Sequence, residues 1–301
     1  MNEHDFLFLA RRFEEHRTHL TAVAYRMLGS LTDAEDAVQE SWLRLARTTG
    51  DDRAADIDNL GGWLTTVVGR VCLDMLRSRR TRREDPLDAR LPDPVVSDDG
   101  ADPAHQAVLA DSVGLALLVV LESLKPAERL AFVLHDLFGM PFEQIAPIMD
   151  RTPVAARKLA SRARRRVQGA APTPDPDPAA QRRVVDAFLA AARGGDLTAL
   201  LAVLDPDVTL RADTGKALPG GMRVLRGAQA VAGQLATFQR MATVSTTRPA
   251  LVNGAAGLVN TIDGTLISVM GFTVADGRIL EIDILSDPDR LARLDLAGLE
   301  R

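Results

Sequence analysis

Two stretches of the sequence concentrate positive charge. Residues 70–83 hold six arginines and one acid, and residues 151–166 hold six arginines, one lysine and no acid. Between them, residues 84–111 hold eight acids and one arginine, while the net charge of the whole chain is only -5. Taken alone, either basic block is most simply a solvated helix face. Two basic helices joined by an acidic connector are instead typical of a chain that contacts nucleic acid at two places.

The first basic block ends a predicted helix. The segment NLGGWLTTVVGRVCLDMLRSRRTRR repeats apolar residues every four positions and would extend ~34 Å. The predicted buried side comprises Trp63, Val67, Val71 and Met75. With that side packed inward, the arginines crowded near the end of the helix are left outside.

The second basic block ends a predicted helix-turn-helix. Gly139 indicates the first turn and Asp150-Arg151 the second, and Pro147 predicts an irregular short helix between them. Thr152 followed by Pro153 predicts a well-capped start for the last helix. Its predicted buried side comprises Ala155, Leu159, Ala163 and Val167. The polar residues between them would face outward, where they could reach base edges and phosphates in a major groove.

A third set of polar side chains is acidic. Thr32 and Glu35 have the spacing of a capping box at the start of a helix, with Asp33 and Asp36 in the first turn, where the helix dipole favours anions. One side of this helix would carry Asp36, Gln39, Glu40 and Leu43. An acidic side is usually just solvated. If it binds anything, phosphates would repel it, so we expect a protein partner.

These helices belong to two predicted all-α domains. Residues 1–83 read as a helical bundle with breaks at Gly29-Ser30 and around 50–62, and helices resume near Gln106 and continue to Gln168. Residues 84–105 contain four prolines and many acids without periodicity, which predicts a linker. Residues 169–180, with alternating prolines, predict a second linker and a domain boundary.

The remainder, residues 181–301, has a different pattern. Two helical stretches, 181–193 and 196–204, precede five β-branched segments: VTLRAD, TTRPALV, GLVNTI, TLISVMGFTV and RILEIDIL. Tight hairpin turns are predicted at Asn253-Gly254, Asp263-Gly264 and Asp276-Gly277. This order predicts an α+β domain in which an antiparallel meander curls over the helices.

The segments AYRMLGSLTDAEDAVQESWLRL, WLTTVVGRVCLDMLRSRRTRR and PVAARKLASRARRRV resemble the two essential domains of bacterial extracytoplasmic-function (ECF) sigma factors. The resemblance covers residues 6–168. It implies a protein that binds core RNA polymerase and promoter DNA and directs transcription initiation. Residues 1–83 would be sigma region 2, and residues 106–168 would be sigma region 4.

The resemblance also assigns binding residues. The clamp helices of the polymerase large subunit would bind Asp33, Asp36, Gln39, Glu40 and Leu43. The minus-10 element would be opened and read by Asn59, Trp63, Arg70, Arg77, Arg79 and Arg80. The minus-35 element would be read by Arg157, Lys158, Ser161, Arg162, Arg164 and Arg165.

Residues 181–301 resemble a SnoaL-like domain, a cone-shaped α+β fold, which implies the sigma factor J-like subfamily. Members carry a WLPEP-like motif between the sigma domains and DGGGK-like and NPDKL-like motifs in the extension. Degenerate counterparts here are ARLPDP, DTGK and DPDRL. They imply interdomain contacts by Leu91, Pro92, Asp93, Pro94, Asp213, Lys216, Asp287, Pro288 and Asp289. The extension is expected to regulate the sigma domains, and a small-molecule ligand could shift that balance.

An alternative function is a SnoaL-like enzyme, of cyclase or isomerase type, fused to a DNA-binding module. Chemistry for it is sparse, because all five histidines precede the second linker. Candidate bases are Asp213, Asp263, Glu281 and Asp283. Neither a cofactor nor a metal is expected, because the carboxylates lack the spacing of metal ligands. We therefore expect no enzymatic activity.

Cysteine content and hydropathy bear on the compartment. Cys72 is the single cysteine, which excludes a disulfide framework and fits a reducing compartment. No apolar run approaches the ~20 residues that span a bilayer, and charges interrupt the opening residues where a signal peptide needs an apolar stretch. The sequence predicts a cytoplasmic protein without membrane contact.

Overall fold

The chain folds into two compact units. The computed structural model describes residues 3–49, 59–81, 90–97, 114–170, 172, 174–215 and 221–294. The first unit combines Met1–Glu84 with Val120–Ala170, and the second combines Asp85–Val119 with Ala171–Arg301. The predicted break near residue 50, the restart near Gln106 and the side chains of Arg80 and Lys216 lie outside the described residues.

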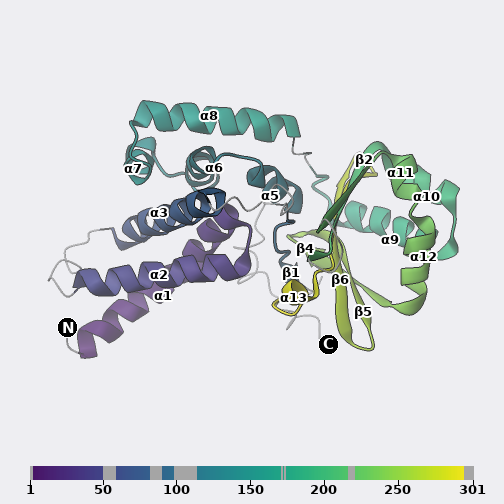
Figure 1. Ribbon diagram of the computed structural model, residues 1–301, viewed down its shortest axis with the longest axis horizontal. Helices are drawn as coiled ribbons and strands as arrows, with labels where there is room; N and C mark the ends of the chain where they lie inside the picture. Colours follow the sequence, from purple (N-terminus) through teal and green to yellow (C-terminus); the bar gives the residue numbers. More distant parts are fainter. Residues whose placement is uncertain are drawn as a thin grey trace. The chain divides into compact units, whose positions relative to one another are not determined.

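Three long helices begin the first unit: α1 (Glu3–Leu28), α2 (Leu31–Thr49) and α3 (Leu60–Thr81). They pack pairwise against one another (Figure 1). Gly29 separates α1 from α2 with a φ of 68°, a conformation that glycine adopts at little cost. The predicted break at Gly29-Ser30 is confirmed.

The predicted capping box is wrong by two residues. The helix begins at Leu31, and the Ser30 hydroxyl accepts a hydrogen bond from the Asp33 amide at 3.4 Å. Ser30 is therefore the N-cap, three residues before Asp33, while Thr32 lies inside the first turn. Ser30 and Thr32 are both good N-cap residues, and the chain turns at Gly29, directly before the earlier one.

The predicted buried side of α3 is also corrected. Leu64, Val68 and Cys72 are fully buried, whereas Trp63, Val67 and Met75 are only partly buried; Val71 is buried as predicted. The helix packs against α1 and α2 and also against α6 and α7, so it buries more than one side. A four-residue recurrence is present in both sets, and spacing alone does not choose between them. Burial raises the pKa of Cys72 to about 12, which makes its thiol inert.

The rest of the first unit forms the helix-turn-helix. It comprises α6 (Pro126–Phe132), a π-helical turn η2 (Val133–Leu137), α7 (Phe142–Ile148) and α8 (Pro153–Ala170). The helix before them, α5 (Leu115–Glu122), begins in the second unit and ends in the first. Positive φ values at Gly139 and Asp150 mark the two predicted turns. Thr152 caps α8 by accepting from the Ala155 amide at 3.3 Å, as predicted.

The buried side of α8 differs from the predicted one. Ala156, Ala160 and Ala163 are fully buried, whereas Ala155, Leu159 and Val167 are only partly buried. Small alanine side chains allow α8 to lie close to α6 and α7. The larger apolar residues therefore cover the edge of the contact instead of filling it.

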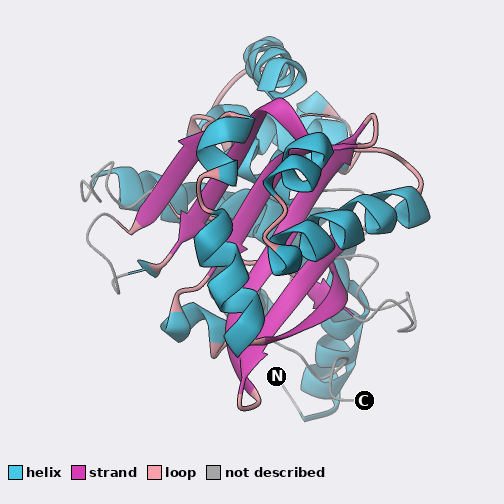
Figure 2. Cartoon of the chain, turned by 90° about the vertical axis from the view of Figure 1, so that its right-hand side faces the viewer, coloured by secondary structure: helices cyan, strands magenta, loops and turns pink. Residues whose placement is uncertain are grey.

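The second unit is a seven-stranded sheet covered by helices. The strands are β1 (Val96–Ser97), β2 (Leu204–Asp213), β3 (Met222–Arg226), β4 (Thr246–Val252), β5 (Ala255–Ile262), β6 (Thr265–Ala275) and β7 (Arg278–Leu285), in the order β1-β4-β5-β6-β7-β2-β3. The helices are α9 (Pro178–Gly194), α10 (Leu197–Val203), α11 (Ala228–Ala232), α12 (Leu235–Val244) and α13 (Pro288–Leu291). Figure 2 looks onto the sheet through the helices that cover it.

The two faces of this sheet have different roles. The face toward α9 and α10 carries a large apolar core that includes Phe188 and Phe272. The opposite face carries a smaller cluster with Val96, Val252 and Leu291. We call them the inner face and the outer face.

All three predicted hairpin turns are confirmed. Each pair places both residues at positive φ, with values of 50–51° at the first position and 69–77° at glycine. The strands from β4 to β7 form the predicted antiparallel meander, but β2 pairs with β7 in parallel. Strand β2 precedes the meander in the sequence but pairs with its last strand, β7. Because this pair is parallel and the meander pairs are antiparallel, the sheet is mixed.

Candidate nucleic-acid interface and linker-binding site

The outward side of α8 gathers the cations predicted to read the minus-35 element. Arg157, Lys158, Arg162 and Arg165 are exposed, and Ser161 and Arg164 are half-buried. Their helix begins at a cap and lies opposite the alanine contact, so one fixed surface presents all six. Such a surface can bind phosphates and base edges.

Several arginines of α8 have partners within the helix-turn-helix. Arg164 binds Asp136 of η2, with its Nε 2.8 Å from the carboxylate, and Arg166 binds Glu128 of α6 at 3.3 Å. The guanidinium of Arg157 lies 5.4 Å above the ring of Phe142. These contacts hold guanidinium groups on either side of the exposed face of α8. Nothing in the local sequence pattern singled out Asp136 or Glu128.

The predicted minus-10 residues lie along α3. Asn59 caps the helix by accepting from the Gly62 amide at 2.9 Å, and Trp63 is half-buried. Three arginines pair with acids: Arg70 with Asp150 at 3.5 Å, Arg77 with Asp74 at 3.8 Å, and Arg79 with Asp33. Except for the half-buried Arg79 pair, these pairs are exposed and contribute little stability.

The acidic side of α2 is presented in part. Asp36, Gln39 and Leu43 are exposed, and Leu43 keeps 41% of its surface accessible. Glu40 binds Arg44 at 2.9 Å, while Asp33 binds Arg79. A predicted polymerase contact and a predicted DNA contact are therefore bound to each other in this state.

The three-helix bundle and the helix-turn-helix meet in a close contact, which we call the seam, where α1 and α3 pack against α6, η2 and α7. A side-chain carbon at Gly69 of α3 would lie 3.4 Å from both Leu130 and Leu134. Arg129 is 2% exposed and donates to the Arg26 carbonyl at 3.2 Å and to Glu122 at 3.0 Å. The seam therefore combines close packing around a glycine with a buried arginine.

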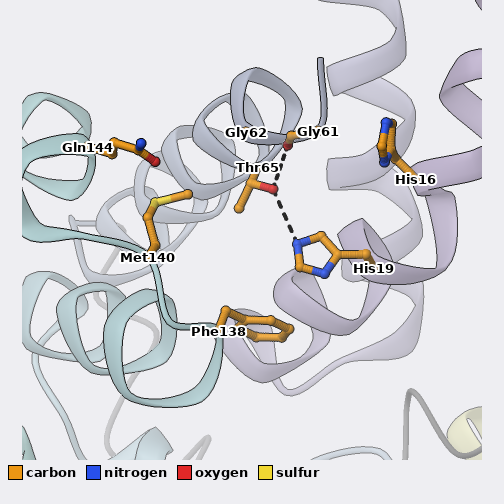
Figure 3. A pocket seen from close by; sticks show the side chains of 8 residues that line it. All are labelled: His16, His19, Gly61, Gly62, Thr65, Phe138, Met140 and Gln144. Carbon is orange, nitrogen blue, oxygen red and sulfur yellow. Dashed lines mark hydrogen bonds between the residues drawn. The ribbon is translucent and has the colours of Figure 1, made fainter. Parts of the chain in front are cut away.

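A cavity of about 360 Å³ opens at the edge of the seam (Figure 3). His19 lies there 3.3 Å from the Thr65 hydroxyl and edge-on to Phe138, with ring centroids 5.2 Å apart. Burial, and then the nearby His16 and Arg26, lowers the pKa of His19. His19 is therefore neutral at neutral pH. From α1 it contacts Thr65 of α3 and Phe138 of the helix-turn-helix.

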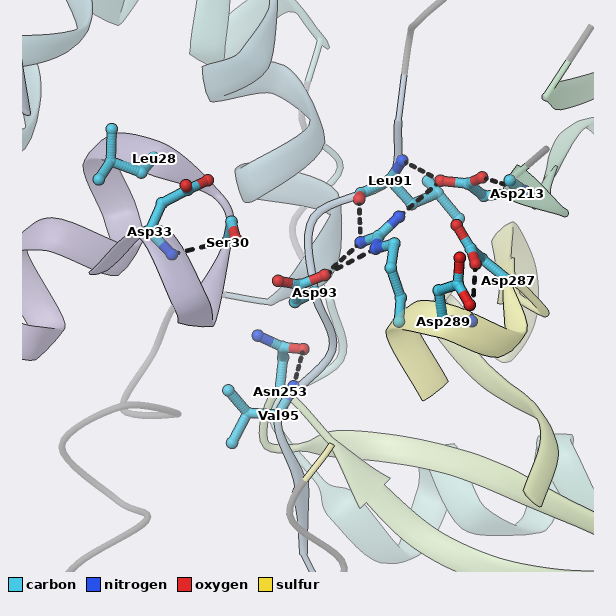
Figure 4. Close-up of polar contacts among 12 residues, drawn as sticks. Leu28, Ser30, Asp33, Leu91, Asp93, Val95, Asp213, Asn253, Asp287 and Asp289 are labelled. Atoms are coloured by element: carbon cyan, nitrogen blue, oxygen red, sulfur yellow. Dashed lines mark hydrogen bonds and ion pairs between the residues drawn. The ribbon is translucent and has the colours of Figure 1, made fainter. Parts of the chain in front are cut away.

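The predicted interdomain motifs meet in the second unit, in a set of contacts that we call the clamp (Figure 4). Arg290 donates to the Leu91 carbonyl at 2.6 Å, to Asp93 at 2.8 Å and to Asp213 at 2.7 Å. Asp213 also accepts from the Leu91 amide at 2.9 Å. Arg290 thus joins the end of β2 to a linker residue that lies 199 positions before it in the sequence.

The linker continues from the clamp as a strand. The Val95 carbonyl accepts a hydrogen bond from the Asn253 amide at 2.8 Å, and the Val95 amide donates to the side-chain oxygen of Asn253 at 3.2 Å. Val96–Ser97 then pair with β4. The sequence predicted an irregular linker here, because a two-residue strand has no periodicity of its own. Its order comes from the edge of β4.

The remaining interdomain residues have different surroundings. Leu91, Pro92 and Pro94 are buried, whereas Pro288 and Asp289 are exposed. Asp287 caps α13 by accepting from the Asp289 amide at 3.0 Å, and it packs against Gly215, whose φ is 57°. Arg290, which belongs to the quoted DPDRL motif but not to the residues selected from it, makes the contact with the linker.

A second ion cluster lies beside the clamp. Arg211 donates to Asp283 at 2.9 Å and to Glu281 at 2.7 Å. Burial raises the pKa of Asp283 to about 6 against the attraction of Arg211.

The predicted bases lie away from the inner core. Along β2, Leu210 points to the inner core, so Arg211 and Asp213 point to the outer face, together with the carboxylates that Arg211 binds. Asp263 is exposed in a hairpin turn. None of the four predicted bases lies in the inner core.

Comparison with known proteins identifies the two helical domains. A model for sigma-70 region 2 matches residues 12–82, and a model for sigma-70 region 4 matches residues 114–167. ECF RNA polymerase sigma factor SigJ of Mycobacterium tuberculosis is 40% identical over 291 residues, covering 92% of this chain and 91% of SigJ. A probable ECF sigma factor of the same organism, SigI, is 39% identical over 302 residues, covering 99% and 100%.

A solved structure extends the similarity to both units. The crystal structure of SigJ matches with a TM-score of 0.75 at 35% sequence identity, covering 95% of this chain and 99% of that one. A region 2 bundle, a region 4 helix-turn-helix and a fused α+β sheet domain, all shared with SigJ, define a transcription initiation factor. The chain belongs to the ECF sigma factors, and it directs RNA polymerase to promoters.

The described residues hold neither a candidate membrane span nor a candidate metal cluster. Among them, no helix is long and apolar enough to cross a membrane. No group of three or more potential metal ligands occurs in the same ranges.

Proposed function

We propose that the C-terminal unit regulates promoter recognition by holding the segment that joins the two sigma domains. The observation that carries this proposal is the clamp, in which buried Asp213 and Arg290 bind both backbone groups of Leu91. A linker bound in this way cannot follow sigma domains that move apart.

The seam supports the same proposal. A promoter with separate minus-10 and minus-35 elements requires the two reading surfaces to separate, whereas α3 packs here against α6 and α7. The packed form is therefore a resting state, and the transcribing form must open it. The clamp restricts that opening because the linker connects the two domains.

The experiment compares the full chain with a chain cut after Gln168, on one promoter and at equal occupancy of core polymerase. We expect the two to differ in transcription. Transcription by the cut chain can be higher or lower than that of the full chain, because the extension both holds the linker and contributes to its order. Equal transcription would make the extension a passenger and would end the proposal.

We propose that α8 binds the minus-35 element mainly through phosphates. Replacing Arg157, Lys158 and Arg164 by alanine should abolish promoter-directed transcription and leave core binding intact. A double variant at two exposed arginines of the second unit, Arg193→Ala and Arg240→Ala, is the matched control. Because phosphate contacts release counterions, the triple variant should also flatten the salt dependence of DNA binding. Normal transcription by the triple variant would contradict the assignment.

We propose that Asp36, Gln39 and Leu43 form the polymerase contact, with Asp33 and Glu40 joining when their arginines are released. An Asp36→Arg, Glu40→Arg double variant should compete poorly for core enzyme. The control, Asp186→Arg with Asp207→Arg, places the same charge change on the second unit. Competition equal to wild type by the first variant would remove this surface from consideration.

We infer that the C-terminal unit acts by holding and not by catalysis. Asp213, Glu281 and Asp283 bind arginines on the outer face, whereas a substrate enclosed by the cone would meet the apolar inner face. A small-molecule ligand of that inner face stays a prediction. Thermal stabilisation by added metabolite pools, followed by mass spectrometry of what is retained, would test it.

A further inference from the structure

One apolar side chain stands on the outward face of α8. Val154 is the second residue of the helix and is 60% exposed, among the most exposed large apolar side chains in the described ranges. The core side of the helix is formed by alanines, so Val154 contributes little to packing. Its branched side chain also loses rotamer freedom in a helix. Neither stability nor packing accounts for a valine here.

The position of Val154 places it in line with polar residues. Residues 154, 158, 161 and 165 are spaced by four, three and four, which puts them on one side of a helix. Lys158 and Arg165 are exposed, and Ser161 is half-buried. Val154 therefore forms the N-terminal end of the outward stripe.

The arginines beside this stripe are held away from it. Arg157 stacks on Phe142 and Arg164 binds Asp136 on one side, while Arg166 binds Glu128 on the other. These guanidinium groups flank the groove-facing line, where they are suited to the phosphates of the two strands. The centre of the stripe near the helix start is left to Val154.

The first residues of the second helix of a helix-turn-helix contact base edges in the major groove. The apolar group on a base edge there is the C5-methyl of thymine. We propose that Val154 reads a thymine methyl group in the minus-35 element, while the flanking arginines bind phosphates. This proposal rests on the assignment of α8 to that element.

The test removes methyl groups from the DNA and from the protein. Holoenzyme made from core polymerase and the full chain first selects a promoter from a random library. Each thymine of its minus-35 element, on either strand, is then replaced singly by deoxyuridine. At one position we expect wild-type binding to fall about fourfold, the value of one buried methyl group.

The variant Val154→Ala should bind the thymine promoter about as weakly and should no longer respond to deoxyuridine at that position. Val244→Ala, at another exposed valine of the chain, is the control and should behave as wild type. The proposal is overturned if the effects of Val154→Ala and deoxyuridine multiply at every position, or if the selected element contains no thymine.

A further variant distinguishes failure of this proposal from failure of the assignment of α8 to the minus-35 element. Lys158→Ala with Arg165→Ala should abolish minus-35 binding if α8 is the reading helix. If that variant binds as wild type, the assignment of α8 has failed and the role of Val154 fails with it. If it loses binding while Val154→Ala and deoxyuridine act independently, only the role of Val154 is wrong.

Discussion

The seam is a contact within the first unit and the clamp is a contact within the second unit, and the two differ in what holds them together. The seam depends on close packing, because a side-chain carbon at Gly69 would already touch Leu130 and Leu134, which leaves no room for a larger side chain. The clamp is ionic and depends on charge, because Arg290 binds two carboxylates and a carbonyl while 12% exposed. Volume changes should therefore open the first, and charge changes the second.

The largest effect should come from removing the cation of the clamp. Arg290→Ala leaves Asp213, 1% exposed, without its guanidinium, and losing one partner of a buried ion pair costs ~3–5 kcal/mol. Residues 90–97 should then detach, and hydrogen exchange of the full chain should show their amides unprotected. Arg293→Ala, an exposed neighbour, should change nothing. Full protection of residues 90–97 in Arg290→Ala would mean that β1 alone holds the linker.

A pH dependence should arise in the ion cluster of the second unit. Burial raises the pKa of Asp283 to about 6, against ~3.9 in an unfolded chain, so the folded state binds this proton more tightly. Its contribution is fully present below pH ~4 and is lost as the pH rises through about 6, a change of ~3 kcal/mol.

Denaturant unfolding of the full chain at pH 4 to 7 measures this contribution. Asp283→Asn should gain stability relative to wild type as the pH rises over that window. Asp263→Asn, an exposed hairpin carboxylate, should follow wild type throughout. A constant difference between Asp283→Asn and wild type would show that Asp283 has an ordinary pKa.

A volume change should open the seam. Gly69→Leu would force side-chain atoms between Leu130 and Leu134, at the ~1–3 kcal/mol typical of overpacking, whereas Gly69→Ala fits at ordinary contact distance. Fluorophores on cysteines introduced at Gln39 and Gln168 would report the separation, since Cys72 is buried and inert. Leucine should lower the transfer efficiency and alanine should not. Equal efficiencies would show that the seam yields elsewhere.

The smallest effect should come from the ion pair at the rim of the first unit. The Asp33–Arg79 pair is about one-third exposed, so Asp33→Asn should cost less than ~1 kcal/mol. Denaturant unfolding beside Asp36→Asn, at an exposed acid of the same helix, measures it. A loss of several kcal/mol would erase the distinction between a buried clamp and a solvated pair.

Local chemistry predicted much of the fold. Asn253-Gly254 and its two counterparts fix tight turns within two residues, and the strands on either side follow from β-branched alternation. The stretch from residue 214 to 245 was not resolved into β3, α11 and α12, because it has little periodicity. Strand β1 could not be predicted from the sequence, because its order comes from pairing with β4, which is distant in the sequence.

The clamp was predicted only as a set of motifs. The family resemblance assigns an interdomain contact to Asp289 of the DPDRL motif, whereas Arg290 of the same motif binds the linker. Spacing does not say which side chain of a short helix turns toward a linker 197 residues away. The same limit explains the buried sides of α3 and α8, where two offset recurrences were both apolar. The roles of the individual polymerase-binding and DNA-binding residues remain predictions.

Pairing between β1 and β4 has a consequence for self-association. The outer edge of β4 is made unattractive to other strands near Arg248 and Pro249, since a charge and a missing N–H both discourage pairing. Leu251 and Val252 have no such protection, and there the linker strand itself covers the edge. On the proposal that transcription requires release of the linker, that release exposes a short unpaired edge of β4. The released form should then dimerise or aggregate as its concentration rises.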